Sequence, residues 1–330
     1  MIAQIDDRYI KARPTKLLPR LLSYGLFEGR PLTTRGQWIN PLISYLFEIE
    51  KRLPQIKQVK KPVFIVGTGR SGTTILGTVL SMHKDVGFLN EPKALWHSIY
   101  PYEDIIGSYT DEMAFYRLNE THVSTETIKN AHRLFGAYLF LTGNSKIIDK
   151  YPELIFRVSF IKKIFPDAKF LFLVRNGWDT CHSIKKWSMR LGVNKKGHVH
   201  DWWGKDNRKW KILIEQIIKQ DTFFKSSINA IENLQDHNDM AIVEWIATMR
   251  EGLRLLRCRP TDIHMVRFED LTHNTLDCLN KIQAFCALDE DKIFQSYAED
   301  VLKPVPPHHR FEINPSIMPL FDDVMQQLGY

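Results

Sequence analysis

Hydrophobic residues in this chain form short β-branched runs that alternate with longer amphipathic stretches. Residues 61–67, KPVFIVG, are an apolar run that ends at a glycine, and residues 73–82 place four aliphatic side chains on one helical face. The first run predicts a buried strand and the second predicts a helix. The glycine-rich residues between them predict a tight loop that connects the two.

A second unit repeats this order. Residues 169–174, KFLFLV, predict a buried strand, residues 175–177 a turn, and residues 178–186 a helix. Smaller strands are predicted at residues 146–148 and 263–268, each near a helical pattern. Strands that alternate with helices indicate a parallel sheet that binds ligands at its carboxyl ends. We therefore expect an α/β fold, a P-loop NTPase-like central parallel sheet flanked by helices.

The chain is expected to divide into an extension and one main domain. Residues 1–60 are basic and contain five prolines, which predicts an N-terminal extension packed on the main domain, with a helix at residues 41–52. Residues 61–330 are expected to form the main domain. Within it, residues 190–256 are polar and rich in Lys and Trp, and they predict a helical insertion.

Charge and composition narrow the classes of function. The 330 residues include 45 Lys and Arg against 38 Asp and Glu, a formal charge of +7 that favours an anionic ligand, a membrane face or nucleic acid. The four cysteines lack metal-binding spacing, so we expect reduced thiols. Charges interrupt the first thirty residues, and no apolar run could span a bilayer. We expect a cytoplasmic protein, free or peripheral at a membrane face, without a transmembrane segment.

The loop at residues 67–74, GTGRSGTT, concentrates the candidate chemistry. Between a strand and a helix, its glycines let several backbone N–H groups point at one anion. It has the GxxxxG frame of a P-loop, but Thr73 replaces the expected lysine and Arg70 is its cation. A kinase needs that lysine and a magnesium ligand for a highly charged phosphoryl group. A sulfuryl group carries less charge, so the loop is suited to bind it without a metal.

Residues 64–76, FIVGTGRSGTTIL, resemble the 5′-phosphosulfate loop of sulfotransferases, especially the carbohydrate and tyrosylprotein branches and their bacterial homologues. The resemblance implies that the donor is 3′-phosphoadenosine 5′-phosphosulfate (PAPS) and that the product is adenosine 3′,5′-bisphosphate (PAP). It also implies that the following loop residues bind the 5′-phosphosulfate: Arg70, Ser71, Gly72, Thr73 and Thr74.

The resemblance extends to the rest of the donor site. In the family, an arginine that ends a strand and a serine eight residues later bind the 3′-phosphate, and Arg175 and Ser183 have this spacing. A guanidinium offers a planar fork to phosphate, which agrees with that role. Phe268, in MVRFEDL, occupies the position of an aromatic residue beside the adenine, although core packing explains it equally well. Arg310 lies where relatives close a basic loop over the donor.

The reaction needs a base and a group that stabilises negative charge. Glu91, in FLNEPK, matches the glutamate proposed as the base in the carbohydrate and tyrosylprotein branches, although a glutamate before proline can also simply end a strand. His97 and His132 are reserve candidates, because cytosolic relatives use histidine. Arg70 is expected to neutralise charge on the bridging oxygen. Lys150 is expected to do the same or to orient the acceptor, unless it only forms an ion pair.

These observations predict metal-independent transfer of a sulfuryl group from PAPS to a hydroxyl or amine, with a carbohydrate or glycolipid as the favoured acceptor. The tryptophans at residues 202–210 could form an acceptor platform within the insertion, or a hydrophobic seam between helices. The alternatives are a P-loop kinase-like phosphotransferase and a non-catalytic nucleotide-binding protein. We expect no nucleic-acid partner, because the basic and aromatic residues cluster beside a small-anion loop.

Overall fold

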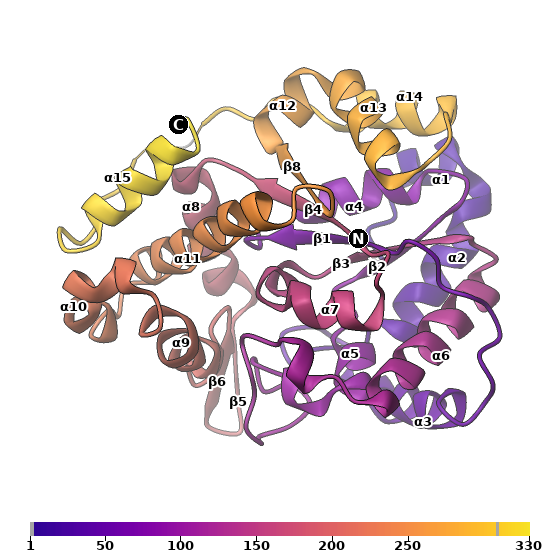
Figure 1. The fold of residues 1–330 in the computed structure, drawn as a ribbon, viewed down its shortest axis with the longest axis horizontal. Coiled ribbons are helices and arrows are strands. Elements are labelled where there is room, and N and C mark those ends of the chain that lie inside the picture. The colour runs from indigo at the N-terminus through magenta and orange to yellow at the C-terminus, as the bar shows by residue number, and fades with distance from the viewer. Residues whose placement is uncertain (1–2, 308–309) are drawn as a thin grey trace.

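A computed structural model describes residues 3–307 and 310–330 (Figure 1). Its centre is a five-stranded sheet in the order β2-β3-β1-β4-β8, in which every neighbouring pair is parallel. This confirms the predicted central parallel sheet flanked by helices, which has the strand order of a P-loop-like fold. The strands are β1 (Val63–Gly67), β2 (Val86–Asn90), β3 (Lys146–Lys150), β4 (Lys169–Val174) and β8 (Ile263–Arg267).

Helices cover both faces of this sheet. Because side chains alternate along a strand, Val63 and Ile65 of β1 pack on one face, while Phe64 and Val66 pack on the other. The first face is covered by α1 (Asp7–Ala12), α4 (Thr73–Ser81), α13 (Thr275–Cys286) and α14 (Lys292–Val301). The second is covered by α5 (Lys93–Ile99), α6 (Thr125–Thr142), α7 (Val158–Ile164), α11 (His237–Cys258) and α15 (Met318–Gln327).

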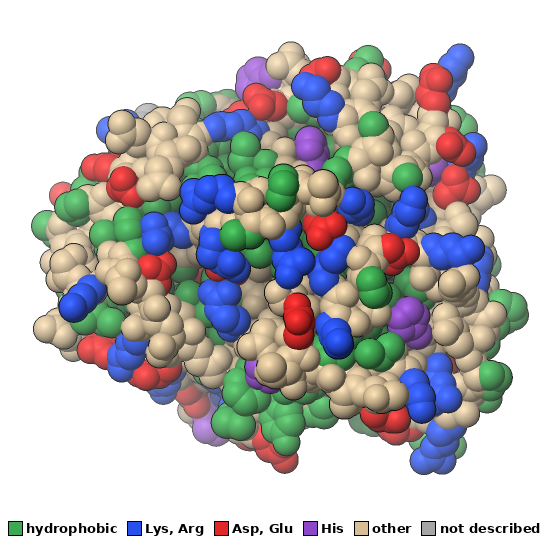
Figure 2. Space-filling view, in the orientation of Figure 1, with side chains coloured by type: hydrophobic (Ala, Val, Ile, Leu, Met, Phe, Trp, Pro, Cys, Tyr) green, Lys and Arg blue, Asp and Glu red, His purple; other side chains and the backbone are tan. Residues whose placement is uncertain are grey.

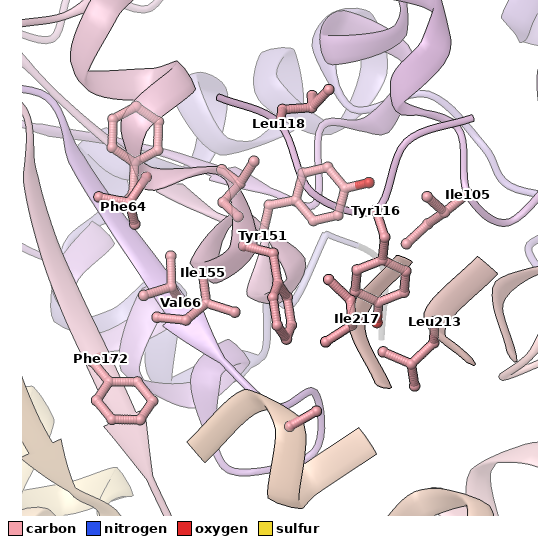
Figure 3. Close-up of a cluster of buried hydrophobic side chains, with 14 of the residues drawn as sticks. Phe64, Val66, Ile105, Tyr116, Leu118, Tyr151, Ile155, Phe172, Leu213 and Ile217 are labelled. Carbon is pink, nitrogen blue, oxygen red and sulfur yellow. The ribbon is translucent and has the colours of Figure 1, made fainter. Parts of the chain in front are cut away.

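The second face holds the larger apolar cluster. Figure 3 shows Phe64, Val66 and Phe172 of the sheet beside aromatic and aliphatic side chains that include Tyr151 and Ile155. Every residue of β1 is buried, as a strand in the middle of a parallel sheet requires. The remaining helices are α2 (Leu17–Leu22), α3 (Asn40–Glu50), α8 (Gly177–Leu191), α9 (Arg208–Leu213), α10 (Ile228–Glu232) and α12 (Phe268–His273).

Within the N-terminal segment, residues 16–27 lie against the edge of the sheet formed by β2. Lys16 is buried, and its ammonium group donates hydrogen bonds to the carbonyl oxygens of Lys84 and Val86 at 2.8 Å each. Tyr9 bonds to Ser81 of α4 at 3.0 Å. A buried lysine is stable only when its donors are satisfied, so these bonds fix the path of the N-terminal segment over the sheet edge.

The segment at residues 190–256 is not wholly helical. It begins with a three-stranded antiparallel sheet of β5 (Val193–Lys195), β6 (His198–Asp201) and β7 (Gly204–Lys205). The turn between β5 and β6 consists of Lys196 and Gly197, both with positive φ (53° and 81°), which suits a two-residue hairpin. The helix that ends the segment, α11, packs against α8 and the sheet and so belongs to the central layers.

Lys and Arg side chains gather over α11 on the face shown in Figure 2. Carboxylates engage three of the arginines there: Arg117 and Arg254 both pair with Glu251, and Arg250 pairs with Asp221. Two carboxylates are thus shared among three arginines, so these ion pairs offset only part of the local positive charge. In the described ranges, no helix combines the length and the apolar content needed to cross a bilayer.

Candidate functional site

The loop between β1 and α4 has the backbone geometry of an anion-binding turn. Gly67, Arg70 and Gly72 all have positive φ, at 140°, 70° and 101°. Gly72 is the N-cap of α4, and a glycine has no side chain that could bond the first N–H groups of the helix. Those N–H groups, at the positive end of the helix dipole, are available to an anion.

Ser71 has a different environment from the other predicted loop residues. Its side chain is fully buried, and its hydroxyl donates to the carbonyl oxygen of Thr68 at 2.6 Å. This bond closes the turn on itself. In this structure Ser71 therefore stabilises the loop, while its neighbours face a cavity.

Seven of the predicted donor-site residues line one cavity of about 390 Å³. The loop approaches α12 so closely that a Cβ atom on Gly72 would lie 2.3 Å from the Phe268 ring, so only glycine fits there. The guanidinium of Arg175 lies over the same ring, 4.5 Å from its centroid. The seven are Arg70, Gly72, Thr73, Thr74, Arg175, Ser183 and Phe268.

Arg175 is suited to bind an anion in this cavity. It directly follows β4, is 9% exposed and pairs with Asp179 at 3.5 Å. Its Nε is buried, with no hydrogen-bond partner among the described residues. A buried donor without a partner is costly, and an anion in the cavity could satisfy it. Ser183, two turns along α8, accepts a hydrogen bond from Nε of Arg70 at 3.2 Å, which places both predicted phosphate ligands beside the loop.

Arg310 lies over the indole ring of Trp178, 5.6 Å from its centroid, and is not among the described residues that line this cavity. Its predicted place over the donor therefore remains a prediction.

The reserve bases are engaged elsewhere. A ring nitrogen of His97 bonds to the carbonyl of Pro101, and one of His132 to that of Ile164.

A second cavity, of about 350 Å³, adjoins the first. Gln4, Arg70 and Thr74 line both, so the two cavities meet at the loop. Glu91, Lys150 and Trp202 line only the second. The arrangement provides two binding compartments with a shared wall.

Glu91 and Lys150 form an ion pair at the carboxyl ends of β2 and β3. Lys93 lies 3.6 Å from the other carboxylate oxygen of Glu91. Burial acts to raise the pKa of Glu91, but Lys150 and then Lys93 outweigh it and hold the pKa below its usual value. The carboxylate is therefore ionised at neutral pH and can accept a proton or a hydrogen bond. Glu91 also has a positive φ of 50°, a strained backbone for a residue before proline.

Below this pair lies a buried charge network that sequence reasoning missed. Lys209 of α9 is 2% exposed and contacts Glu153 at 3.1 Å and Glu244 of α11 at 2.5 Å. The Trp202 indole N–H donates to Glu244 at 2.6 Å, and Lys209 lies 4.6 Å from the centre of the same indole. Trp202 also packs on Gly69, where a Cβ atom would lie 2.4 Å from its ring.

One local signal could have identified part of this network. Lys93 and Glu153 each follow a proline just after the carboxyl end of a parallel strand, in the sequences EPK and YPE. Charged residues at such positions face the ligand edge of the sheet. Of the predicted tryptophan platform, Trp202 lines the cavity, whereas Trp203 and Trp210 pack against each other in the core.

The sheet, the glycine-rich loop and the two cavities define a P-loop-like α/β protein with a candidate anion site at the carboxyl edge of its strands. A sequence model of the sulfotransferase family matches residues 62–225, which include both predicted anion-binding motifs. The chain belongs to the sulfotransferase family. In the described ranges, no three His, Cys, Asp or Glu side chains come together in a way that could hold a metal ion.

Relatives match part of the chain. The protein-tyrosine sulfotransferase of Drosophila melanogaster is 28% identical over 144 residues, which are 43% of this chain and 28% of that protein. Protein-tyrosine sulfotransferase 1 of Danio rerio is 29% identical over 160 residues, 48% of this chain and 44% of that protein. The chain thus spans less than half the length of these relatives. A sulfotransferase from Mycobacterium avium aligns over 98% of this chain and 92% of its own, with TM-score 0.48 and 11% identity.

Replacing Lys209 by methionine should lower the free energy of unfolding at pH 7 by about 3 kcal/mol, because Glu153 and Glu244 would lose their buried cation. Burial acts to raise the pKa of Glu153, but Lys209 and Lys93 depress it overall. The carboxylate of Glu153 therefore makes its full contribution to stability above pH 4.5, its ordinary pKa. This contribution is lost only as the pH falls through the lower pKa of the folded state.

The loss of unfolding free energy in Lys209→Met should become smaller below pH 5, because the unpaired carboxylates can then be protonated. Urea unfolding at several pH values measures this, with Lys211→Met as the control, because Lys211 is exposed. An equal loss in the two variants would contradict the role of the network.

Proposed function

We propose that this protein is a sulfotransferase that transfers a sulfuryl group from PAPS to an acceptor hydroxyl. The observation that carries the proposal is the junction of two cavities at Arg70 and Thr74. Group transfer requires donor and acceptor to meet at one point while each has its own binding compartment. A protein that only bound a nucleotide would need the first cavity alone.

The first cavity suits the donor. The N–H groups at the start of α4 and the hydroxyls of Thr73 and Thr74 would hold the 5′-phosphosulfate. Arg175 and Ser183 would hold the 3′-phosphate, and the unpartnered Nε of Arg175 fits that role. Phe268 would contact the adenine. When bound, PAPS supplies an activated sulfuryl group and leaves as PAP.

The chain's own residues would then serve the transfer. Glu91, ionised at neutral pH, would accept the proton of the acceptor hydroxyl. Arg70, at the junction, would stabilise the negative charge that develops there. Lys150 holds the Glu91 carboxylate through its ion pair and so positions the base.

For the acceptor we propose a carbohydrate or glycolipid hydroxyl. The second cavity is lined by cations and anions in pairs, together with Tyr24, Trp187 and Trp202. Paired charges offer many hydrogen bonds without a large net field, and indole faces stack on sugars, which suits a neutral polyhydroxyl ligand. The names of the relatives favour a second candidate, a tyrosine hydroxyl in a protein. Sulfate transfer to a panel of sugars, glycolipids and tyrosine peptides would separate the two.

We also propose how the chain divides. Residues 61–330 would form the sulfotransferase domain, with residues 190–256 as its acceptor-binding part because they supply Trp202 and Lys209. Residues 1–60 would be an extension that also serves the site, since residues 28–34 line the acceptor cavity. A cytoplasmic location, free or at a membrane face, belongs to the same proposal.

Calorimetric titration with PAP and with ATP, each with and without Mg²⁺, tests the donor assignment. We expect tight binding of PAP that is insensitive to Mg²⁺, because Thr73 replaces the P-loop lysine that a kinase requires. A preference for Mg-ATP would overturn the assignment in favour of a kinase. PAP binding without transfer to any acceptor of the panel would favour a non-catalytic binder.

Arg175→Ala should weaken PAP binding by more than about 1 kcal/mol, because it removes a charge-assisted contact from a nearly buried site. Arg257→Ala is the matched control, since Arg257 lines a separate cavity. The same calorimetric titration measures both variants. If they bind PAP equally well, Arg175 does not contact the donor.

Glu91→Gln should bind PAP like the unmodified protein and lower turnover by about a hundredfold or more, as for a lost general base. Because Lys150 and Lys93 keep the pKa of Glu91 below its usual value, the base stays ionised, and we expect no loss of kcat/KM as the pH falls from 7 to 5. Radiolabelled sulfate transfer measures both effects, with Glu290→Gln as the control. Normal turnover in Glu91→Gln would show that another group is the base.

A further inference from the structure

An exposed apolar stripe runs along α3 and the residues that flank it. Leu42, Tyr45 and Ile49 follow one another at intervals of three or four residues and so share one side of α3, while Trp38 lies just before the helix and Leu53 just after it. Each is between 40% and 82% exposed, and Trp38 is the most exposed of the five. Single exposed apolar residues are ordinary, but a continuous row of them marks an interaction surface.

The stripe faces away from the body of the protein. Ile43 and Phe47, on the opposite side of α3, are fully buried, and α3 packs on α5 and α6. Figure 1 shows α3 at the lower edge of the molecule, beyond α6. One side of α3 therefore packs into the core. The apolar stripe on the other side has no partner among the described residues.

A basic segment adjoins the start of the stripe. Residues 185–200, which are the end of α8 and the hairpin of β5 and β6 up to its last residue, Asp201, contain five Lys and Arg and no Asp or Glu, and one of the five, Lys185, pairs with Asp236. Exposed apolar side chains lie among these cations, including Met189 (79% exposed) and Val199 (49%). The segment meets the α3 side directly, because Nζ of Lys195 donates to Oε1 of Gln37, next to Trp38, at 2.7 Å.

The stripe and the basic segment also border the proposed acceptor cavity. The side-chain NH2 group of Gln37 lies within hydrogen-bond distance of three carbonyl oxygens of residues 31–34, at 2.6 to 3.3 Å, and these residues line the cavity. Trp187 and Leu191, at the end of α8, line the same cavity. One glutamine thus connects the cavity wall, the hairpin and the beginning of the stripe.

We propose that the stripe and residues 185–200 form a docking face for an anionic lipid bilayer. Tryptophan and tyrosine favour the interface between headgroups and acyl chains, where an amphipathic helix can bury its apolar side. Clustered lysines and arginines add attraction to anionic headgroups. If the proposed function holds, the acceptor hydroxyl belongs to an amphiphile presented at the bilayer surface.

The positive charge of the docking face favours an anionic bilayer over a second copy of the chain as its binding partner. A symmetric dimer through this face would bring two copies of the same acid-free segment near one another. Like charges opposed across an interface repel, whereas anionic headgroups complement them. The same segment that disfavours a dimer therefore favours a lipid surface.

Co-flotation with vesicles tests the docking face. Vesicles of phosphatidylcholine with a minor fraction of phosphatidylserine should bind the protein at least about tenfold more tightly than phosphatidylcholine alone. Trp38→Ala/Tyr45→Ala should lower binding to the mixed vesicles by about tenfold or more, since it removes the two aromatic side chains. Leu276→Ala/Ile293→Ala is the control, because both residues are exposed on other helices.

A charge-reversed pair separates electrostatic from apolar binding. Lys195→Glu/Lys196→Glu should lower binding to the mixed vesicles by about tenfold or more, whereas Lys292→Glu/Lys303→Glu should change it little. PAP titration shows that each variant is folded, and it also distinguishes failure of the docking face from failure of the donor assignment. Absence of vesicle binding, or equal losses in test and control variants, would overturn the proposal. A dimer in sedimentation that Trp38→Ala/Tyr45→Ala abolishes would assign the face to a second copy instead.

Discussion

The pairing of β1 with β3 on one side and β4 on the other determines where every reactive group lies. Parallel registry aligns the carboxyl ends of these strands, so the residues that follow them converge on one edge. The glycine-rich loop leaves β1, Arg175 leaves β4, and Lys150 ends β3 beside Glu91, which leaves β2. A slip of the register by one residue would turn these side chains to the opposite faces of their strands.

The loop itself depends on close contacts that only glycine permits. Gly72 meets the Phe268 ring and Gly69 meets the Trp202 ring, one in each cavity. The loop is thus held between an aromatic residue of the proposed donor cavity and one of the proposed acceptor cavity. Trp202 is in turn held by Glu244 and Lys209, so the buried charge network supports the loop from below.

The residues of the proposed donor cavity could be predicted from local sequence, but the charge network beside the proposed acceptor cavity could not. A glycine-rich turn after a buried strand, and an arginine and a serine eight residues apart on a strand and the next helix, are features of one stretch of chain, and their placement follows from strand and helix geometry. Lys209, Glu153 and Glu244 come from three distant segments, and only the folded chain brings them together. The polar composition of residues 190–256 predicts a helical segment, so it does not reveal the hairpin at residues 193–201.

Arg70 borders both cavities, and its side chain bonds to Ser183. A ligand in either cavity that contacts Arg70 would therefore influence the position of the same side chain. If one ligand changes the affinity for the other through Arg70, thermodynamic linkage requires the second ligand to change the affinity for the first by the same factor. Two ligands that both contact this guanidinium would bind interdependently without any movement of domains.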